Sequence, residues 1–345
     1  MITRQLIFQQ PQPFPSCHAS TLAHLGGDDF LAAWFGGSHE KNPDTAIWGA
    51  ARRGGRWEPP RRLAKATAEA HWNPVLFRAP AGRAHLFFKV GLDPRHWHTW
   101  TLTSDDEGRT WSDPRELCPG DDLPRGPVKN KPIVLADGDW LAPASREYFQ
   151  GDRILWDAFV DRSRDAGATW QAGPFVPLEH NRFEGSGAIQ PTLWESTPGQ
   201  VHMLLRTTAQ RVGRSDSSDG GRTWSPLRLL DLPQNAGLDV ARLADGTLVL
   251  ASNPVTQGRT PLSLHVSRDN GHGWQRVLDV ETQPGNFSYP SIIATGPDEV
   301  AMVYTWHCRS IGFWMGRLGI HVRRLENRKL YHNSSSSPHG TLEGK

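Results

Sequence analysis

The sequence predicts an all-β protein, specifically a six-bladed β-propeller made of four-stranded antiparallel blades. Three observations support this prediction. A short phrase recurs along the chain, its copies lie about fifty residues apart, and the segments between them alternate apolar and polar residues as strands do. Helical periodicity over more than two turns is absent before residue 310, so the repeating unit is expected to consist of strands.

The recurring phrase reads Ser-x-Asp-x-Gly-x-Thr-Trp. Gly273 replaces the threonine in the last copy, and a worn fifth copy ends at Trp57. The five tryptophans that close these copies are separated by 54, 59, 54 and 50 residues, which is about the length of one propeller blade. The four good copies occupy residues 104–111, 163–170, 217–224 and 267–274.

The chemistry of this phrase favours a tight turn. The aspartate can accept hydrogen bonds from backbone N–H groups two residues on, and the glycine allows a positive φ, so the segment closes a hairpin. The threonine and tryptophan then begin the next strand, with the indole packed between neighbouring blades. We therefore expect four tryptophans to be largely buried at equivalent places on successive blades: Trp111, Trp170, Trp224 and Trp274.

A calcium loop is the alternative interpretation, because Asp105, Asp106 and Glu107 place three carboxylates close together. No glutamate follows at the twelfth position, however, and the other copies carry arginine among the candidate ligands. The structural turn is therefore favoured, and we expect neither a metal site nor a cofactor.

Strand-like segments such as AHLFFKV, TLVLAS and LSLHVS flank the copies. Five copies, with an N-terminal strand completing the last sheet, give six blades. We expect residues 1–315 to form a single propeller. Residues 316–345 differ in composition, with an arginine-rich stretch before HNSSSSPHGTLEGK, and are expected to form a partly disordered tail.

Composition excludes several classes of function. The 345 residues include 38 Lys and Arg against 36 Asp and Glu, which gives no reason to expect nucleic acid or an anionic membrane as partner. No apolar run reaches the roughly 18 residues of a membrane span, and no secretory signal is recognisable, so a cytoplasmic location is expected. The three widely spaced cysteines, Cys17, Cys118 and Cys308, are expected to remain reduced. Zinc-protease, Cys-x-x-Cys, nucleophile-elbow and phosphate-loop motifs are absent.

The repeated phrase in an all-β chain resembles the Asp-boxes of the sialidase (neuraminidase) superfamily, and the resemblance covers roughly residues 14–310. Asp-boxes lie on the blade periphery in that family, so they support the fold, and function has to be argued from other residues. Sialidases of this kind bind the substrate carboxylate with three arginines. They use a tyrosine nucleophile assisted by a glutamate, and an aspartate as acid/base.

Several segments resemble those that carry these residues. NFSYPSIIATGPDEVAMVYTW implies Tyr289 as nucleophile, and WFGGSHEKNPDTAIW implies Asp44 as acid/base. IQPTLW followed by VHMLLRTT implies Arg206, but Gln190 stands where the family has its glutamate. QGRTPLSLHVSRDNG implies Arg259 as a further arginine of the triad.

The first arginine of the triad is missing, because no arginine lies between Arg4 and Arg52 and the chain reads PSCHASTLAHL at the expected place. The chain therefore resembles an uncharacterised branch of predicted neuraminidases. Other polar residues near the expected inner ends of the blades are candidates to bind substrate in its stead: His18, His71, Asn73, Lys89, Lys129 and Glu147.

Each candidate also has a plain structural interpretation. Tyr289 suits a packed strand, Asp44 and the histidines suit turns, and a lone lysine in a strand usually reaches solvent. If the resemblance holds, Asp44, Arg206, Arg259 and Tyr289 come from four blades and meet at one central cleft. We expect His18, His71 and one of Lys89 or Lys129 to lie there too.

These residues favour a glycoside hydrolase of sialidase type acting on an acidic sugar, either sialic acid-like or in a uronic acid-containing glycan. Two forked guanidinium groups suit a carboxylate, so the expected partner is an acidic carbohydrate. A polysaccharide lyase acting on uronate glycans is one alternative, with His71 and either Lys89 or Arg206 as its chemical groups. A non-catalytic carbohydrate-binding propeller is another, which Gln190 in place of the glutamate favours.

Overall fold

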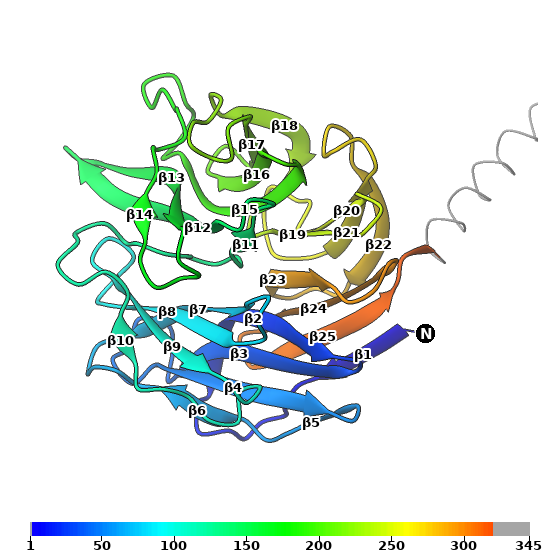
Figure 1. Ribbon diagram of the computed structural model, residues 1–345. Helices are drawn as coiled ribbons and strands as arrows, with labels where there is room; N and C mark the ends of the chain where they lie inside the picture. Colours follow the sequence, from blue (N-terminus) through cyan, green and yellow to red (C-terminus); the bar gives the residue numbers. More distant parts are fainter. Residues whose placement is uncertain (1, 320–345) are drawn as a thin grey trace, which may run out of the picture.

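Six antiparallel sheets surround one central axis in the computed structural model, which describes residues 2–319 (Figure 1). Each sheet has four strands along its hydrogen-bonded path, and the innermost strands β2, β7, β11, β15, β19 and β23 lie nearest the axis. The predicted six-bladed propeller is confirmed.

The blades follow one another in chain order. Blade 1 contains β2 (Ser16–Gly26), β3 (Asp29–Gly37), β4 (Ala46–Arg53) and β5 (Arg56–Trp57), with β6 (Arg61–Ala64) also paired to β4; blade 2 contains β7 (His71–Arg78), β8 (Ala84–Val90), β9 (His98–Ser104) and β10 (Arg115–Glu116). Blade 3 contains β11 (Ile133–Val134), β12 (Trp140–Gln150), β13 (Arg153–Ser163) and β14 (Gln171–Ala172); blade 4 contains β15 (Ala188–Thr197), β16 (Gln200–Thr207), β17 (Arg211–Ser217) and β18 (Arg228–Pro233). Blade 5 contains β19 (Asp239–Arg242), β20 (Leu248–Ser252), β21 (Leu262–Ser267) and β22 (Gln275–Glu281).

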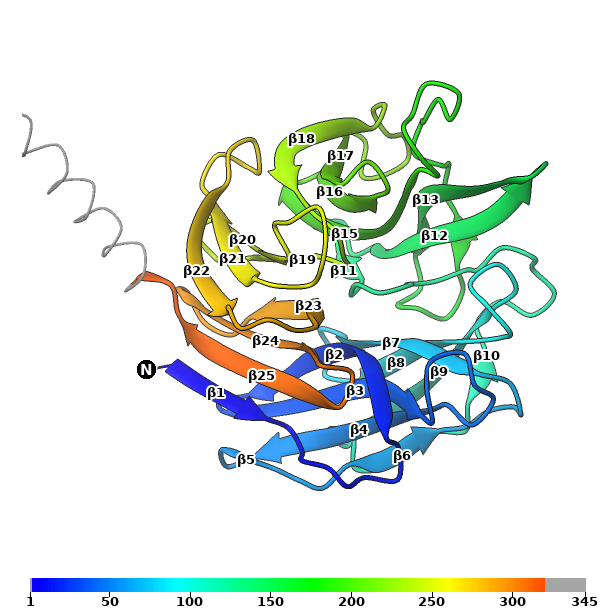
Figure 2. The same cartoon turned by 180° about the vertical axis from the view of Figure 1, so that it is seen from behind.

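Blade 3 differs from the others in its long central hairpin. Strands β12 and β13 have 11 residues each, and they remain paired from Trp140↔Ser163 to Gln150↔Arg153. Their neighbours β11 and β14 have two residues each and pair only with the first part of this hairpin. The far part of the hairpin therefore extends beyond its own sheet, as the view from behind shows (Figure 2).

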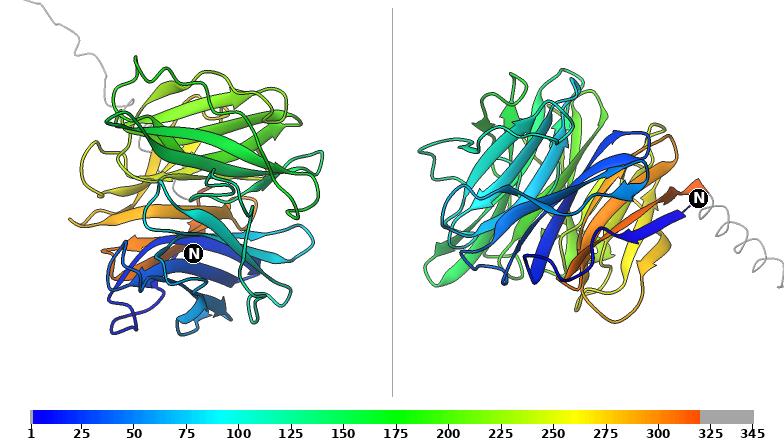
Figure 3. Two further views of the ribbon diagram at one scale, coloured as in Figure 1. Left: turned by 90° about the vertical axis from the view of Figure 1, so that its left-hand side faces the viewer. Right: turned by 90° about the horizontal axis from the view of Figure 1, so that it is seen from below.

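Blade 6 closes the ring. It contains β23 (Phe287–Ala294), β24 (Glu299–Trp306) and β25 (Ser310–Arg317), and β1 (Ile2–Leu6) pairs with β25 as the outermost strand. The N-terminal strand thus completes the last sheet as predicted (Figure 3). Strand β25 continues two residues beyond the expected boundary at 315, and Leu318 packs into the core. The rest of the expected tail, residues 320–345, lies outside the described residues.

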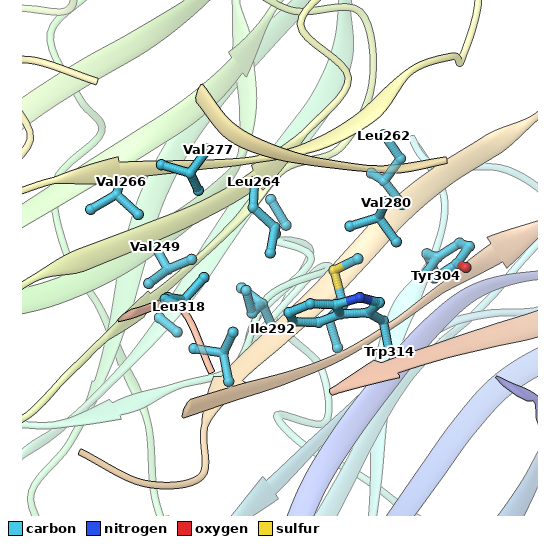
Figure 4. Packing of buried hydrophobic residues seen from close by; sticks show 14 of the residues in the cluster. Val249, Leu262, Leu264, Val266, Val277, Val280, Ile292, Tyr304, Trp314 and Leu318 are labelled. Atoms are coloured by element: carbon cyan, nitrogen blue, oxygen red, sulfur yellow. The ribbon is translucent and has the colours of Figure 1, made fainter. Parts of the chain in front are cut away.

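Apolar side chains from adjacent blades hold the ring together. One cluster joins Val249 and Leu264 of blade 5 to Ile292 and Trp314 of blade 6 (Figure 4). Both faces of a blade are covered by neighbours, so a second strand such as β20 is buried at every position. Burial of this kind contributes about 25 cal/mol for each Å² of apolar surface removed from water.

The Asp-boxes form turns between the third and fourth strands of their blades. In the copy that begins at Ser104, the serine hydroxyl donates to Asp106 (2.8 Å) and accepts from the N–H of Gly108 (2.8 Å). The Asp106 carboxylate accepts from the N–H and hydroxyl of Thr110. The expected bond to an N–H two residues on was wrong: the partner is four residues on, because two residues with positive φ, Glu107 and Gly108, tighten the turn.

The burial of the box tryptophans is less complete than predicted. Trp224 is buried, whereas Trp111, Trp170 and Trp274 keep intermediate exposure. The expectation that the threonine and tryptophan begin the next strand was wrong, because each outer strand begins one to four residues after its box tryptophan. All four nevertheless pack against core clusters, and each does so at the corresponding place in its own blade.

The three cysteines are free thiols. Cys17 and Cys308 lie side by side where blade 1 meets blade 6, since the N–H of Cys17 donates to the carbonyl of Cys308 (2.9 Å). Burial raises the pKa of the Cys17 thiol, and the neighbouring Cys308 adds to the rise.

Candidate active site

The inner strands of four blades share one irregularity. In each, the pairing register shifts around a non-glycine residue with positive φ, a conformation that costs energy for bulky side chains. Proline follows three of the four residues and cannot donate a ladder hydrogen bond, so it suits a bulge. The residues and their φ angles are Ala19 (54°), Asn73 (36°), Gln190 (55°) and Tyr289 (54°).

Lys129 and Asn130 hold two of these bulges in place. The amide of Asn130 donates to the carbonyls of Gln190 (3.1 Å) and Pro191 (3.0 Å). The ammonium of Lys129 donates to Asn130 Oδ1 (2.8 Å), to the carbonyl of Leu238 (3.1 Å) and to that of Pro290. These three oxygens use all the N–H groups of Lys129, and burial lowers its pKa to about 7. The geometry therefore gives Lys129 a supporting position.

Five side chains from four blades, Tyr289 among them, come together beside these bulges. Arg206 Nη1 donates to the Tyr289 hydroxyl (2.9 Å), and Gln190 Nε2 lies 3.4 Å from the same oxygen. The Arg259 guanidinium lies 5.5 Å from the centre of the Tyr289 ring, and the His18 ring centre lies 4.4 Å from it. We call His18, Gln190, Arg206, Arg259 and Tyr289 the central cluster.

Two buried polar atoms of the central cluster have no hydrogen-bond partner, Gln190 Oε1 and Arg259 Nη1. Buried polar groups are nearly always paired, and leaving one unpaired costs about 1–3 kcal/mol. The loop that carries Arg259 is nonetheless well fixed, because Asn253 donates to the carbonyls of Arg259 (3.0 Å) and Pro261 (2.9 Å). The site thus holds a guanidinium N–H and an amide oxygen ready for a ligand.

His18 occupies the place where the resemblance led us to expect an arginine. The hydroxyl of Thr305 accepts from the N–H of Ala19 (3.1 Å), so its own proton is free to donate to His18 Nδ1 (2.9 Å). This assigns the remaining ring proton to Nε2. Burial lowers the pKa of His18 to about 3, and the charges of Arg259 and Arg206 add to the effect. His18 is therefore a neutral hydrogen-bond donor at pH 7.

Two carboxyl groups feel the charges of these arginines. Glu40, in the loop between β3 and β4, is exposed, yet partial loss of hydration at its carboxyl group raises its pKa against the charges of Lys41, Arg259 and Arg206. Burial likewise raises the pKa of Glu147, and the charge of Arg206 opposes the rise. Both groups therefore hold a proton to higher pH than a fully hydrated glutamate does.

Asp44 lies in the same loop as Glu40 but has local partners. Its carboxylate accepts from the N–H (2.9 Å) and hydroxyl (3.1 Å) of Ser38 and is exposed. The structure thus brings Arg206, Arg259, Tyr289 and His18 together, and it gives Asp44 the bonding of a turn residue.

Comparison with known proteins identifies the family. A family described as BNR repeat-like domain matches residues 28–302, which is most of the chain. The chain belongs to this family of sialidase-like propellers. A sialidase from Bacteroides fragilis is 24% identical over 238 residues, which cover 62% of this chain and 40% of the sialidase. The chain thus spans less than half the length of that relative.

Solved structures share the propeller. A Hadza microbial sialidase superposes with a TM-score of 0.73 at 18% identity, covering 89% of this chain and 66% of the other. The leech intramolecular trans-sialidase gives 0.71 at 14% identity, covering 93% and 71%. A protein of unknown function from Dyadobacter fermentans gives 0.75 at 15% identity, covering 92% and 99%. At these identities the likeness establishes the fold alone.

Two residues that we expected near the centre of this BNR propeller have internal partners instead. His71 Nε2 accepts from the N–H of Ala66 (2.8 Å), and its Nδ1 donates to the carbonyl of Glu69 (2.9 Å). Lys89 donates to Thr99 and to the carbonyls of Pro124 (3.2 Å) and Arg125 (2.8 Å). Burial lowers the pKa of His71 to about 4 and that of Lys89 to about 7. Both satisfy backbone groups that would otherwise be unpaired.

The remaining candidate, Asn73, lies at the bulge of β7, the position that Gln190 and Tyr289 occupy in their own strands. Sequence reasoning missed Trp156, whose ring lies 5.4 Å from the Arg206 guanidinium. The pairing register of the long hairpin could have revealed Trp156, because it places Trp156 opposite Glu147, which was already a candidate. Among residues 2–319, no three histidine, cysteine or acidic side chains are grouped to hold a metal, and no helix is long and apolar enough to cross a membrane.

Proposed function

We propose that the chain is a glycoside hydrolase of sialidase type that releases an acidic sugar, sialic acid-like or uronic, from the end of a glycan. One observation carries this proposal: two arginines and a neutral histidine from three blades converge on Tyr289, itself from a fourth. Such an arrangement requires three strands and one loop to bring their side chains to the same place, and a packed tyrosine alone does not require it.

The arginines fit a carboxylate. Arg259 keeps an unpaired N–H inside the site, and Arg206 reaches the same tyrosine from blade 4. Two guanidinium groups and the Nε2–H of His18 then offer donors to the acid and to a neighbouring hydroxyl. Since His18 is neutral, the site carries one positive charge fewer than three arginines would supply.

Tyr289 is proposed as the nucleophile. A phenol oxygen approaches a sugar acid without the charge repulsion that a carboxylate would meet. Because Arg206 donates to this oxygen, the hydroxyl proton points away from Arg206. Gln190 replaces the glutamate that the resemblance implies, and an amide cannot take up that proton, so the proton passes to water as the tyrosine–sugar bond forms and the bond to the leaving oxygen breaks. We therefore expect slow turnover.

Glu40 is a better proton donor than Asp44. A carboxyl group with a raised pKa keeps its proton to higher pH than an ordinary glutamate and can pass it to the leaving oxygen. Glu40 has a raised pKa and feels Arg206 and Arg259, whereas Asp44 is bonded to Ser38. The proposed mechanism assigns the proton transfer to Glu40 and loop support to Asp44.

A carbohydrate-binding propeller without catalysis is the second candidate, and Gln190 is the observation that favours it. The lyase alternative has lost support, because His71 and Lys89 are bonded to backbone groups of the loops before β7 and after β10.

Product analysis on sialylated and uronate glycans tests the proposal. A hydrolase releases a saturated reducing acid, a lyase gives a product that absorbs in the near ultraviolet, and a binder gives neither. Tyr289→Phe should lower kcat by at least ~1000-fold and change the Kd of the acid by only a few fold. Glu40→Gln should lose most activity while Asp44→Asn keeps it. Turnover by Tyr289→Phe at the wild-type rate would contradict the mechanism.

A further inference from the structure

The far part of the β12–β13 hairpin carries an unusual surface beside the central cluster. In the register of this hairpin, Glu147 pairs with Trp156 and Phe149 pairs with Ile154. Directly opposed residues in antiparallel strands lie on the same face, as do residues two apart. These four side chains therefore form one continuous face of the hairpin, which we call the hairpin strip.

The hairpin strip is continuous with the central cluster at one end. The Arg206 guanidinium donates to the Tyr289 hydroxyl (2.9 Å) and lies 5.4 Å from the centre of the Trp156 ring. The charge of Arg206 also acts on Glu147. A ligand whose acid group is held at Tyr289 would therefore meet Trp156 and Glu147 next.

The other end of the hairpin strip is apolar and open to solvent. Four large hydrophobic side chains are exposed in the part of the chain that the structure describes, and Phe149 (56%) and Ile154 (39%) are two of them. A third, Leu92 (71%), lies in a loop of blade 2. Arg95 of the same loop contacts the hairpin strip, because its guanidinium is 4.6 Å from the Phe149 ring centre. Gathered exposed apolar side chains mark binding surfaces.

Charged groups that can form hydrogen bonds lie between these apolar side chains. Arg95 is held rigidly by Asp93, which accepts from Arg95 Nε (3.2 Å) and Nη2 (2.6 Å). Glu147 lies between Phe149 and the central cluster and feels the charge of Arg95 as well. The strip thus combines aromatic faces with fixed donors and acceptors along one line.

We propose that the hairpin strip binds the sugar residues that follow the acidic sugar in an oligosaccharide substrate, so that the protein acts on glycans in preference to simple glycosides. This proposal rests on the hydrolase function proposed above. A pyranose has an apolar C–H face that packs on Trp156 or Phe149 and hydroxyl edges that bond to Glu147 and Arg95. A protein partner would need a surface of roughly 1,000 Å² or more, well beyond a few side chains.

The experiment compares two substrates that share one acidic sugar, its methyl glycoside and an oligosaccharide that ends in it. The double variant Phe149→Ser/Ile154→Ser should lower kcat/KM for the oligosaccharide about 10-fold, mainly through KM, and leave the methyl glycoside within 2-fold. Ile2→Ser is the matched control, because Ile2 is equally exposed (50%) but lies on β1. An equal effect on both substrates, or on neither, would overturn the proposal.

The strip and the hydrolase proposal can fail separately. If the wild-type protein hydrolyses neither substrate, the hydrolase proposal fails, and the strip is then tested by calorimetry with the same oligosaccharide. A 10-fold weaker Kd for the double variant, with Ile2→Ser unchanged, would support the strip alone. An unchanged Kd would overturn it.

Discussion

The Asp-box turns and the central cluster show opposite ways of using polar residues. In the box that begins at Ser163, the serine, Asp165 and Thr169 bond to one another within seven residues of chain. In the central cluster, Arg206 and Tyr289 are 83 residues apart, and Gln190 Oε1 and Arg259 Nη1 remain without partners. The boxes satisfy themselves locally and therefore recur. The centre is assembled from different residues in every blade and keeps unpaired groups for a ligand.

This contrast predicts that substitutions at the centre change function and substitutions in the boxes change stability. Among the changes in ligand binding and stability that this contrast predicts, the largest is expected for Arg206→Ala. Loss of a charge-assisted bond to a carboxylate costs about 1.5–3 kcal/mol, so the Kd of the acidic ligand should rise roughly 10- to 100-fold. The free energy of unfolding should change by less than about 1 kcal/mol, since Arg206 is only half-buried. Calorimetry and urea unfolding of the same samples check both statements. If the Arg206→Ala variant fails to fold, the prediction that central residues affect function and not stability is wrong.

The box glycines provide the complementary case. Gly221 has a φ of +82°, and a Cβ there would come within 2.9 Å of the Leu141 side chain and 3.3 Å of Trp224. Gly199, in the turn between β15 and β16, has the same φ (+81°) but no atom closer than 3.9 Å. Gly221→Ala should therefore cost about 2 kcal/mol in unfolding free energy, and Gly199→Ala about 1 kcal/mol, which is the cost of backbone strain alone. Equal costs would show that blade contact at the box contributes nothing. Ligand affinity should be unchanged in both.

The fold could be predicted almost fully from the sequence, because the box bonds are local and leave a fixed pattern of residue types. Tyr289, Arg206 and Arg259 could be proposed as a site because the segments around them resemble a family. Lys129, Lys89 and His71 could not be placed, since their partners are mostly backbone carbonyl and N–H groups, which leave no trace in residue identity.

Two further features also depend on three-dimensional detail. Glu40 and Asp44 are four residues apart in one loop, and only the path of that loop decides which carboxyl feels the charges of Arg206 and Arg259. The exposed end of the β12–β13 hairpin looks like any apolar strand in sequence. Its exposure follows from β11 and β14 being too short to cover it.

His18 allows the centre to be tested by pH. Its pKa in the folded protein is lowered to about 3, while an unfolded histidine has a pKa near 6.5. Between these values the unfolded chain binds more protons than the folded one, so stability falls as pH decreases from about 6.5 toward 3. His18→Gln removes this titration. When the pH is lowered from 6.5 to 4.5, the unfolding free energy of the wild type should decrease by about 1–2 kcal/mol more than that of the variant. Identical pH dependence in urea unfolding would mean that His18 is charged in the fold.

The smallest effect separates two boxes that differ by one hydroxyl. Asp165 accepts from Ser163 Oγ (2.8 Å), from the N–H of Thr169 (2.8 Å) and from its hydroxyl (2.5 Å). Asp269 accepts the equivalent bonds from Ser267 (2.7 Å) and the N–H of Gly273 (2.8 Å), but Gly273 has no hydroxyl to offer. Hydrogen bonds from Thr169 lower the pKa of Asp165 to about 2, so its contribution to stability is present above about pH 4 and is lost as pH falls toward 2.

Asp165→Asn should therefore lower Tm at pH 7 more than Asp269→Asn does, by roughly 1–3 °C, since both carboxylates are exposed and water screens the charge they lose. Differential scanning calorimetry of the two variants measures this difference directly, and the difference should shrink as the pH falls toward 2, because the wild-type Asp165 carboxylate then becomes protonated. An equal or larger loss from Asp269→Asn would show that the threonine hydroxyl adds no stability. Gly273 in place of threonine would then cost the box of blade 5 no stability.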